Sequence, residues 1–188
     1  MSWVILGAGL VIWWLAHLFK RIAPQLRAAV GNTGKAAIAI ALVLAVVLMV
    51  LGYRETPVIV VWSPPAFLIT VNNVLMMIAV YFYTPAAKYG VVISGVRHPM
   101  LLGFKTWALA HLLVNGDLAS IVLFAALLFW AVAEMVVINR AEPNWDKASA
   151  ASRRRSLGND ALFMVASGVI VAALGYVHYW LGVWPFPS

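Results

Sequence analysis

The stretch Arg97-His98-Pro99-Met100-Leu101-Leu102-Gly103 runs on through an apolar segment that holds Lys105, Trp107 and His111, and ends at the turn Asn115-Gly116-Asp117. Two imidazoles, a guanidinium and an ammonium therefore lie in or beside a segment with the composition of a membrane helix. Ionisable groups are costly to bury at membrane depth, so they mark functional sites by default. We expect the chemistry of the chain to lie here.

The composition indicates that most of the chain is solvated by lipid. Of its 188 residues, 64% are hydrophobic and 10% are charged, and the mean hydropathy is +0.95. A soluble domain carries roughly a quarter charged residues. The net charge of +7 is distributed between apolar blocks, as orientation in a bilayer requires. The expected partner is therefore the lipid bilayer and not a nucleic acid, and the absence of cysteine excludes disulfides and thiolate ligands.

Runs of about twenty apolar residues are needed to cross the hydrocarbon core. The expected spans lie at about 2–20, 36–53, 66–83, 99–114, 118–139 and 160–181. The fourth span is short and contains Lys105. The predicted fold class is all-α, a polytopic integral membrane helix bundle of about six transmembrane helices that forms a single transmembrane domain over residues 1–188.

The lysines and arginines predict how the bundle is oriented. They follow the first, third and fifth spans, and only Arg54 lies on the other side. The positive-inside rule then places the three basic connections in the cytoplasm and both termini in the periplasm of a bacterial inner (plasma) membrane. The run Arg153-Arg154-Arg155, with Lys147 before it, is expected to contact anionic lipid. Asp117 is expected to cap the fifth helix.

Four histidines lie within or at the ends of these spans, namely His17, His98, His111 and His178. A single histidine in a helix bundle is more often a hydrogen-bonded packing residue than a ligand. Four of them, with none in the long polar loop, favour a metal that imidazole binds, such as haem iron, zinc or copper. Metal binding is therefore the expected chemistry.

Helical spacing groups further residues with these histidines. Gly103, Trp107 and His111 follow one another at i, i+4 and share one face of the fourth helix, while Trp14 lies three residues before His17 in the first. Small residues allow close helix packing, but a flat macrocycle beside a histidine needs the same space. Periodicity leaves both interpretations open.

Depth along the helices suggests which histidines pair. At 1.5 Å per residue, His17 and His98 lie at the same level near the cytoplasmic end, and His111 lies roughly 18 Å beyond Pro99, near the level of His178. Two axial ligands must bracket one iron. By depth alone, the natural pairs are therefore His111 with His178 and His17 with His98.

Glu134 is the one carboxylate inside a strongly apolar span. An unpaired charge at that depth is costly, so it is expected to pair with Arg97, Lys105 or Arg140. The alternative is a role as general acid or base, which makes Glu134 a candidate catalytic residue together with His98.

The central motif, with Trp107-Ala108-Leu109-Ala110-His111 and Asn115-Gly116-Asp117-Leu118-Ala119-Ser120, resembles the NnrU family of bacterial membrane proteins. The likeness covers nearly the whole chain. It extends to features listed here in chain order: His17 with Ala23-Pro24-x-Leu26-Arg27, the loop from Trp62 to Pro65, Asn159-Asp160 and His178. Members of this family are associated with denitrification and nitric oxide metabolism.

The NnrU family is in turn similar to ζ-carotene isomerase, a membrane enzyme that carries haem b. The resemblance implies haem b with a redox-linked change of ligation. His111 and His17 would be the iron ligands, with His178 as the alternative partner that the depth estimate favours. The other expected cofactor contacts are Arg97, His98, Gly103, Trp107 and Trp14. The expected function is cis-trans isomerisation of a hydrophobic polyene or lipid substrate, or a redox or nitric oxide-linked step of denitrification.

A second likeness gives the alternative function. Arg-His-Pro-x-x-x-Gly followed by a helical hairpin is similar to membrane methyltransferases of the isoprenylcysteine and phospholipid type. That resemblance implies S-adenosylmethionine as the cofactor, with contacts from Arg97, His98, Arg140 and Glu142. The paired glutamates usual in those enzymes are reduced here to Glu142 followed by Pro143.

Overall fold

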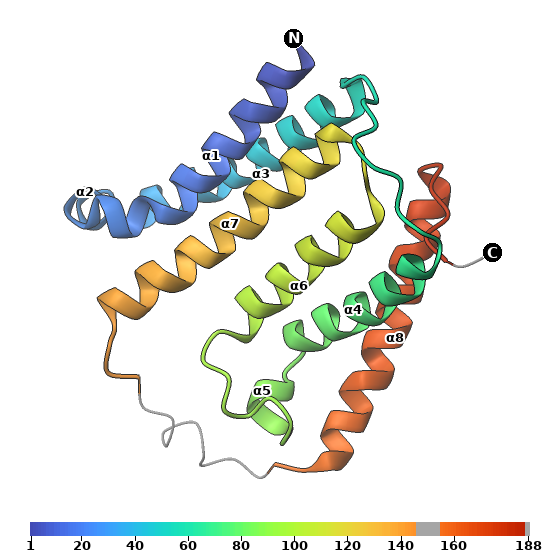
Figure 1. The fold of residues 1–188 in the computed structure, drawn as a ribbon. Helices are drawn as coiled ribbons and strands as arrows, with labels where there is room; N and C mark the ends of the chain where they lie inside the picture. Colours follow the sequence, from blue (N-terminus) through green and yellow to red (C-terminus); the bar gives the residue numbers. More distant parts are fainter. Residues whose placement is uncertain (146–154, 187–188) are drawn as a thin grey trace.

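A computed structural model describes residues 1–145 and 155–186, and throughout these ranges the chain is helical with connecting loops (Figure 1). The helices are α1 (Ser2–Ile22), α2 (Pro24–Ala29), α3 (Gly31–Glu55), α4 (Phe67–Tyr83), α5 (Ala86–Tyr89), α6 (Pro99–Val114), α7 (Leu118–Ala141) and α8 (Leu157–Trp180). The predicted fold class, an all-α membrane bundle, is confirmed.

The six long helices coincide with the six predicted spans. Helices α1, α3, α7 and α8 are long and apolar enough to cross a membrane, whereas α4 and α6 are apolar helices of 17 and 16 residues. The short helices α2 and α5 were not predicted. Each has a proline at its start, Pro24 and Pro85, where a missing N–H costs nothing. Lys147, Arg153 and Arg154 lie outside the described residues.

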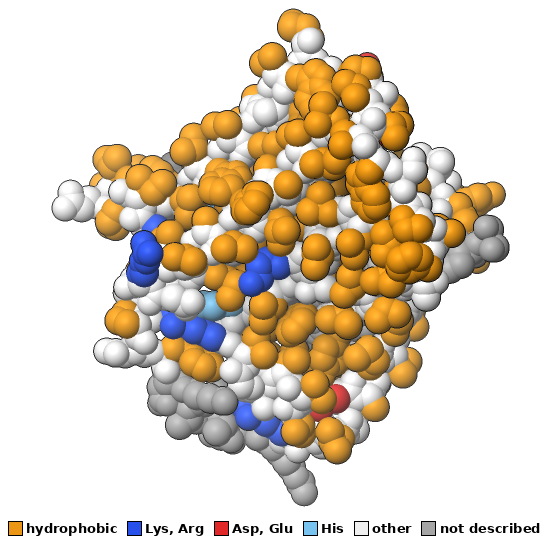
Figure 2. Space-filling view, in the orientation of Figure 1, with side chains coloured by type: hydrophobic (Ala, Val, Ile, Leu, Met, Phe, Trp, Pro, Cys, Tyr) orange, Lys and Arg blue, Asp and Glu red, His pale blue; other side chains and the backbone are white. Residues whose placement is uncertain are grey.

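The long helices pack in the order α3, α1, α7, α6, α4 and α8. In Figure 1, α1 and α3 lie at the upper left, α7, α6 and α4 follow toward the lower right, and α8 lies at the right. Apolar side chains cover most of the face drawn in Figure 2, and its lysines and arginines gather in the lower half. A surface this apolar suits lipid, not water. Helix α8 packs on α4 and α5 at one edge of the row.

Glycines allow α1 and α3 to approach closely. A Cβ atom added at Gly9 would lie 2.8 Å from the Ala45 carbonyl oxygen and 2.8 Å from the Met49 amide nitrogen. Gly52 of α3 lies in the same way against the Leu6 backbone. Small residues at such crossings are a general feature of membrane helix packing.

The loop between α3 and α4 is hydrogen-bonded to the turn between α6 and α7. The amides of Val61 and Trp62 donate to the Gly116 carbonyl at 2.8 and 3.1 Å, and the Leu118 amide donates to the Ile59 carbonyl at 2.8 Å. These bonds satisfy backbone groups at one end of the bundle, where unpaired groups would be costly.

Asp117 caps α7, as the sequence predicted. Its carboxylate accepts the Ser120 amide at 2.9 Å and the Ser120 hydroxyl at 2.5 Å. The Ser120 hydroxyl also lies 2.8 Å from that of Tyr53 in α3. The cap therefore links α7 to α3 as well as satisfying an amide at the start of the helix.

Asp160 fastens the first turn of α8. Its buried carboxylate accepts the Tyr81 hydroxyl from α4, and it accepts the amides of Val91 and Val92 at 2.6 and 3.4 Å. One carboxylate thus joins α8 to α4 and to the loop after α5. A buried charge is tolerated when several donors surround it.

Candidate functional site

The structure brings His111 and His178 together. They lie in the last turns of α6 and α8, and their ring centroids are 6.5 Å apart. Each Nδ1 lies at hydrogen-bond distance from a carbonyl one turn earlier, that of Trp107 at 2.9 Å and that of Leu174 at 2.8 Å. Because a carbonyl only accepts, each Nδ1 carries the proton. Each Nε2 therefore keeps a lone pair that can bind a metal.

The two imidazoles gathered here are the number of donors that a haem would need from the protein. Two imidazoles on opposite sides of one metal ion, each bonded at about 2 Å, have ring centroids roughly 6 Å apart, close to the separation of His111 and His178. A structural zinc site needs three or four protein ligands, and no group of three or more His, Asp or Glu side chains gathers within the described ranges. Haem needs only axial ligands from the protein, so two histidines are enough.

His17 lies away from this pair. Its ring contacts the indoles of Trp13 and Trp130, at centroid distances of 4.3 and 4.4 Å. Its Nδ1 lies 3.0 Å from the Trp13 carbonyl, so its Nε2 also keeps a lone pair. Of the two pairs that depth suggested, the structure brings together His111 and His178 but not His17 and His98.

Aromatic rings connect His17 to the histidine pair. We call this series of contacts the aromatic row, and its neighbouring centroids are 4.3 to 6.5 Å apart. In order of contact the row contains His17, Trp13, Trp130, Phe104, Trp107, His111 and His178. Trp107 was predicted as a site residue and contacts His111 directly at 4.9 Å. Trp13 was missed, although it precedes His17 by four residues and so shares its helix face.

Two of the predicted cofactor contacts hold helices together. The Trp14 indole donates to the Ala126 carbonyl at 3.2 Å and so fastens α1 to α7. A Cβ atom at Gly103 would lie 2.7 Å from the Ala79 carbonyl oxygen. Gly103 therefore lets α6 approach α4.

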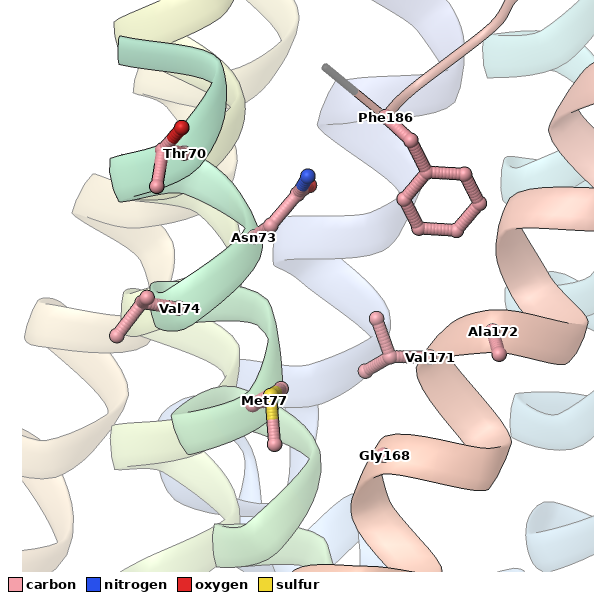
Figure 3. A pocket seen from close by; sticks show the side chains of 8 residues that line it. All are labelled: Thr70, Asn73, Val74, Met77, Gly168, Val171, Ala172 and Phe186. Atoms are coloured by element: carbon pink, nitrogen blue, oxygen red, sulfur yellow. The ribbon is translucent and has the colours of Figure 1, made fainter. Parts of the chain in front are cut away.

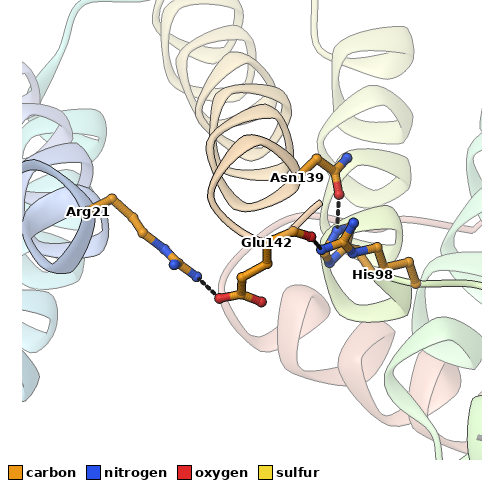
Figure 4. Close-up of polar contacts among 5 residues, drawn as sticks. Arg21, His98, Asn139 and Glu142 are labelled. Carbon is orange, nitrogen blue, oxygen red and sulfur yellow. Dashed lines mark hydrogen bonds and ion pairs between the residues drawn. The ribbon is translucent and has the colours of Figure 1, made fainter. Parts of the chain in front are cut away.

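The Arg-His-Pro motif binds the C-terminal end of α7 (Figure 4). His98 Nε2 lies 2.8 Å from Asn139 Oδ1, and the Arg97 guanidinium donates to the Glu142 carbonyl. The Glu142 carboxylate pairs with Arg21 of α1 at 2.8 Å. The hydrogen bond and charge of Arg21 hold the pKa of the Glu142 carboxyl below its usual range. These side chains join α1, α6 and α7, and His98 Nε2 is engaged by Asn139.

Glu134 does not pair as predicted. Arg97, Lys105 and Arg140 all lie in the described ranges, yet no ion pair joins any of them to Glu134. Its Oε2 is buried with no hydrogen-bond partner among the described residues. The prediction failed because the periodicity of the fifth span does not indicate which neighbouring helix Glu134 faces.

A pocket of about 330 Å³ lies between α4 and α8 (Figure 3). Met77 and Val171 line its walls, and Asn73 supplies a polar amide at one end. Phe186, from the segment after α8, also lines the pocket and packs on Gly175, one turn before His178. Apolar pockets with few polar groups are typical of sites for hydrophobic small molecules.

A comparison with family models gives a match to the family described as NnrU protein, over residues 5–185 of the 188-residue chain. Neither the comparison with curated proteins nor that with solved structures gives a match. The matched range contains all six long helices except the first three residues of α1. Because the match spans almost its entire length, this chain belongs to the NnrU protein family.

Proposed function

We propose that this NnrU-family membrane protein binds haem b, with His111 and His178 as the axial ligands. The observation that supports this is the 6.5 Å separation of the two rings, each with Nδ1 engaged by its own helix. Backbone carbonyls that fix the ligand tautomer in this way are the usual outer shell of metal-binding histidines. His17 takes no part in this pair, in contrast to what the family resemblance implies.

The two ligands differ in how firmly the fold holds them. His111 belongs to α6, which packs between α4 and α7, whereas His178 belongs to α8 at the edge of the row. In this proposal His111 would be the more firmly held ligand of the haem and His178 the less firmly held one. Bound haem would supply a Lewis-acidic iron with an open position, which could also bind nitric oxide.

The proposed activity is a ζ-carotene-isomerase-like cis-trans isomerisation of a polyene. The pocket between α4 and α8 supports this choice over a purely nitric oxide-linked role, because its lining is apolar and it lies on the helix that carries His178. In this proposal the pocket walls would hold the hydrophobic chain beside the helix that carries His178.

Absorption spectra of the purified protein, oxidised and reduced, test haem binding. Cells supplied with ample haem should yield a protein with a Soret band. We expect His111→Ala to lose most of the band, and His178→Ala to keep part of it with a shift to a five-coordinate spectrum. His17→Ala and His98→Ala are the matched controls and should keep the wild-type spectrum. A colourless wild type, or equal losses in His17→Ala and His111→Ala, would contradict the proposal.

Carotenoid isomer composition tests the proposed activity separately from haem binding. The protein is expressed in cells that accumulate a poly-cis-carotene, and the isomers are separated by chromatography. Gly168→Phe, which fills the pocket, should abolish a shift seen with the wild type while leaving the Soret band intact. A haem-loaded wild type that leaves the isomers unchanged would refute the isomerase, and a spectral shift with nitric oxide would then favour the denitrification role.

Binding of S-adenosylmethionine tests the alternative function. In the structure Arg97 and His98 are hydrogen-bonded to the end of α7, so they serve as structural contacts in our proposal. Binding is measured by calorimetric titration of the colourless protein with S-adenosylmethionine. Binding by the wild type that is lost in Arg97→Gln would instead favour a methyltransferase.

The basic end of the bundle is proposed to face the cytoplasm of a bacterial inner membrane, with both termini in the periplasm. The cations that support this orientation are Lys20 and Arg21 at the end of α1, Arg27 in α2, Lys88 in α5 and Arg140 in α7. Reporter fusions to the two termini test this orientation. A phosphatase that is active only in the periplasm should be active at both termini, and a fluorescent protein that folds only in the cytoplasm should be dark at both.

A further inference from the structure

A groove of about 460 Å³ opens between α1 and α3 and is independent of the histidine pair. Leu15 and Phe19 line it from α1, and Gly34, Ala37 and Ala41 line it from α3. The small side chains at these α3 positions leave a space that Leu15 and Phe19 do not fill. The lining is almost entirely apolar, so the groove suits a hydrocarbon chain.

The packing of the two helices explains where the groove lies. They are in close contact around Gly9 and Gly52, and the groove lies nearer the end where α2 connects them (Figure 1). On this side the lining runs from Val30, the residue before α3, to Ala41, roughly 16 Å at the rise of a helix. That length is about half of a hydrocarbon core of ~30 Å. The groove therefore matches one leaflet in depth.

The Arg27 side chain lies at one end of the groove, which we call its mouth. The Arg27 guanidinium donates to the Gly31 carbonyl at 3.0 Å, and its Nη1 lies 3.5 Å from the place a Cβ at Gly34 would take. One of its five donors is used in that bond. Lys35 follows Gly34 directly, and neither Arg27 nor Lys35 forms an ion pair with a carboxylate of the described residues. A phosphate is the group that such donors recognise.

We propose that this groove binds an anionic phospholipid, with an acyl chain between α1 and α3 and the phosphate at Arg27. The apolar groove and the charged mouth lie in the order that a lipid presents to a helix bundle, with the headgroup at the helix ends and the chain between them. A second copy of the protein would fill the apolar groove but would bring further cations to the mouth, because the net charge is +7. Charge complementarity therefore favours the lipid.

Native mass spectrometry of the full-length protein tests this proposal. The protein is released from nanodiscs that contain equal amounts of phosphatidylglycerol and phosphatidylcholine, and the retained lipids are counted. We expect one phosphatidylglycerol to be retained at least tenfold in preference to phosphatidylcholine. Arg27→Gln should lower this preference about fivefold, the effect of one cation near a membrane surface. Arg54→Gln, which removes the same charge at the other end of α3, should leave it unchanged.

A second pair of variants tests the groove itself. Ala37→Phe fills the groove and should abolish retention of the lipid, whereas Val43→Phe adds the same ring to an exposed part of α3 and should not. Size-exclusion profiles check that both variants fold. Equal retention of the two lipids by the wild type, equal effects of Arg27→Gln and Arg54→Gln, or a dimer in place of a lipid adduct would each overturn the proposal.

Discussion

Alanine substitutions at Gly7 and Gly9 should have opposite effects, although the two glycines are two residues apart in α1. A Cβ at Gly7 meets no atom within 4 Å, whereas one at Gly9 lies 2.8 Å from the Ala45 carbonyl oxygen and the Met49 amide nitrogen. The atoms that obstruct it are backbone atoms of α3, so a change of rotamer cannot remove the overlap. Accommodating the methyl group requires the two helices to move apart.

The magnitude follows from two opposing effects. Replacing glycine by alanine in a helix favours the folded state by about 0.8–1.0 kcal/mol at either site. Overpacking a close contact costs typically about 1–3 kcal/mol, and this cost applies only at Gly9. The Gly9→Ala variant should therefore be about 2 kcal/mol less stable than Gly7→Ala, which is roughly thirtyfold in the unfolding equilibrium.

Unfolding of the purified protein in mixed micelles of dodecylmaltoside and SDS, followed by tryptophan fluorescence, measures this difference. Gly7→Ala is the matched control, because it carries the same change in composition and helix propensity. If Gly9→Ala were as stable as Gly7→Ala, the close approach of α1 and α3 described for this structure would be refuted.

Three further predictions concern the polar contacts between helices. The pair of Glu142 with Arg21 lowers the pKa of that carboxyl, so its contribution to stability is fully present above the unfolded pKa of about 4.3 and is lost as the pH falls through the lower folded value. Glu142→Gln should slightly lower the thermal midpoint at pH 7 but not at pH 3, and equal midpoints at pH 7 would argue against the pair. Asp160→Ala leaves buried donors unpaired and should destabilise the protein by at least about 2 kcal/mol in the same micelle assay, whereas a neutral result would show that α8 is held otherwise. Trp14→Phe should cost about 1 kcal/mol in the same assay because the indole hydrogen bond to the Ala126 carbonyl is lost, and an unchanged stability would contradict that bond.

The positions of the long helices could be predicted from the sequence because long apolar runs bounded by polar residues are a local signal. Asp117 was predictable as a cap for the same reason, since it precedes α7 directly. The short helices α2 and α5 have no apolar run to reveal them. Their prolines indicate where a helix starts but not that one forms.

Contacts between helices were predicted only in part. The depth estimate paired His111 with His178, because the helical rise places both residues at about the same level in the membrane. The same estimate placed His98 beside His17, although His98 lies against Asn139 of α7. Helical periodicity shows which residues share a face but not which helix that face meets. For the same reason the spacing grouped Trp14 with His17, whereas Trp13 is the tryptophan that contacts it.

The hydrogen bonds between the α3–α4 loop and Gly116 also bear on how the protein is assembled during synthesis. They join backbone groups more than fifty residues apart in the sequence, and closing a loop of that length has an entropic cost that only the surrounding structure can offset. The loop leaves the ribosome before α6 and α7 are synthesised. Until these two helices are inserted, its amides can form hydrogen bonds only with water or lipid headgroups. Protection of Val61 and Trp62 from amide exchange should therefore be one of the last signals to develop in a nascent chain, and it would mark completed assembly at that end of the bundle.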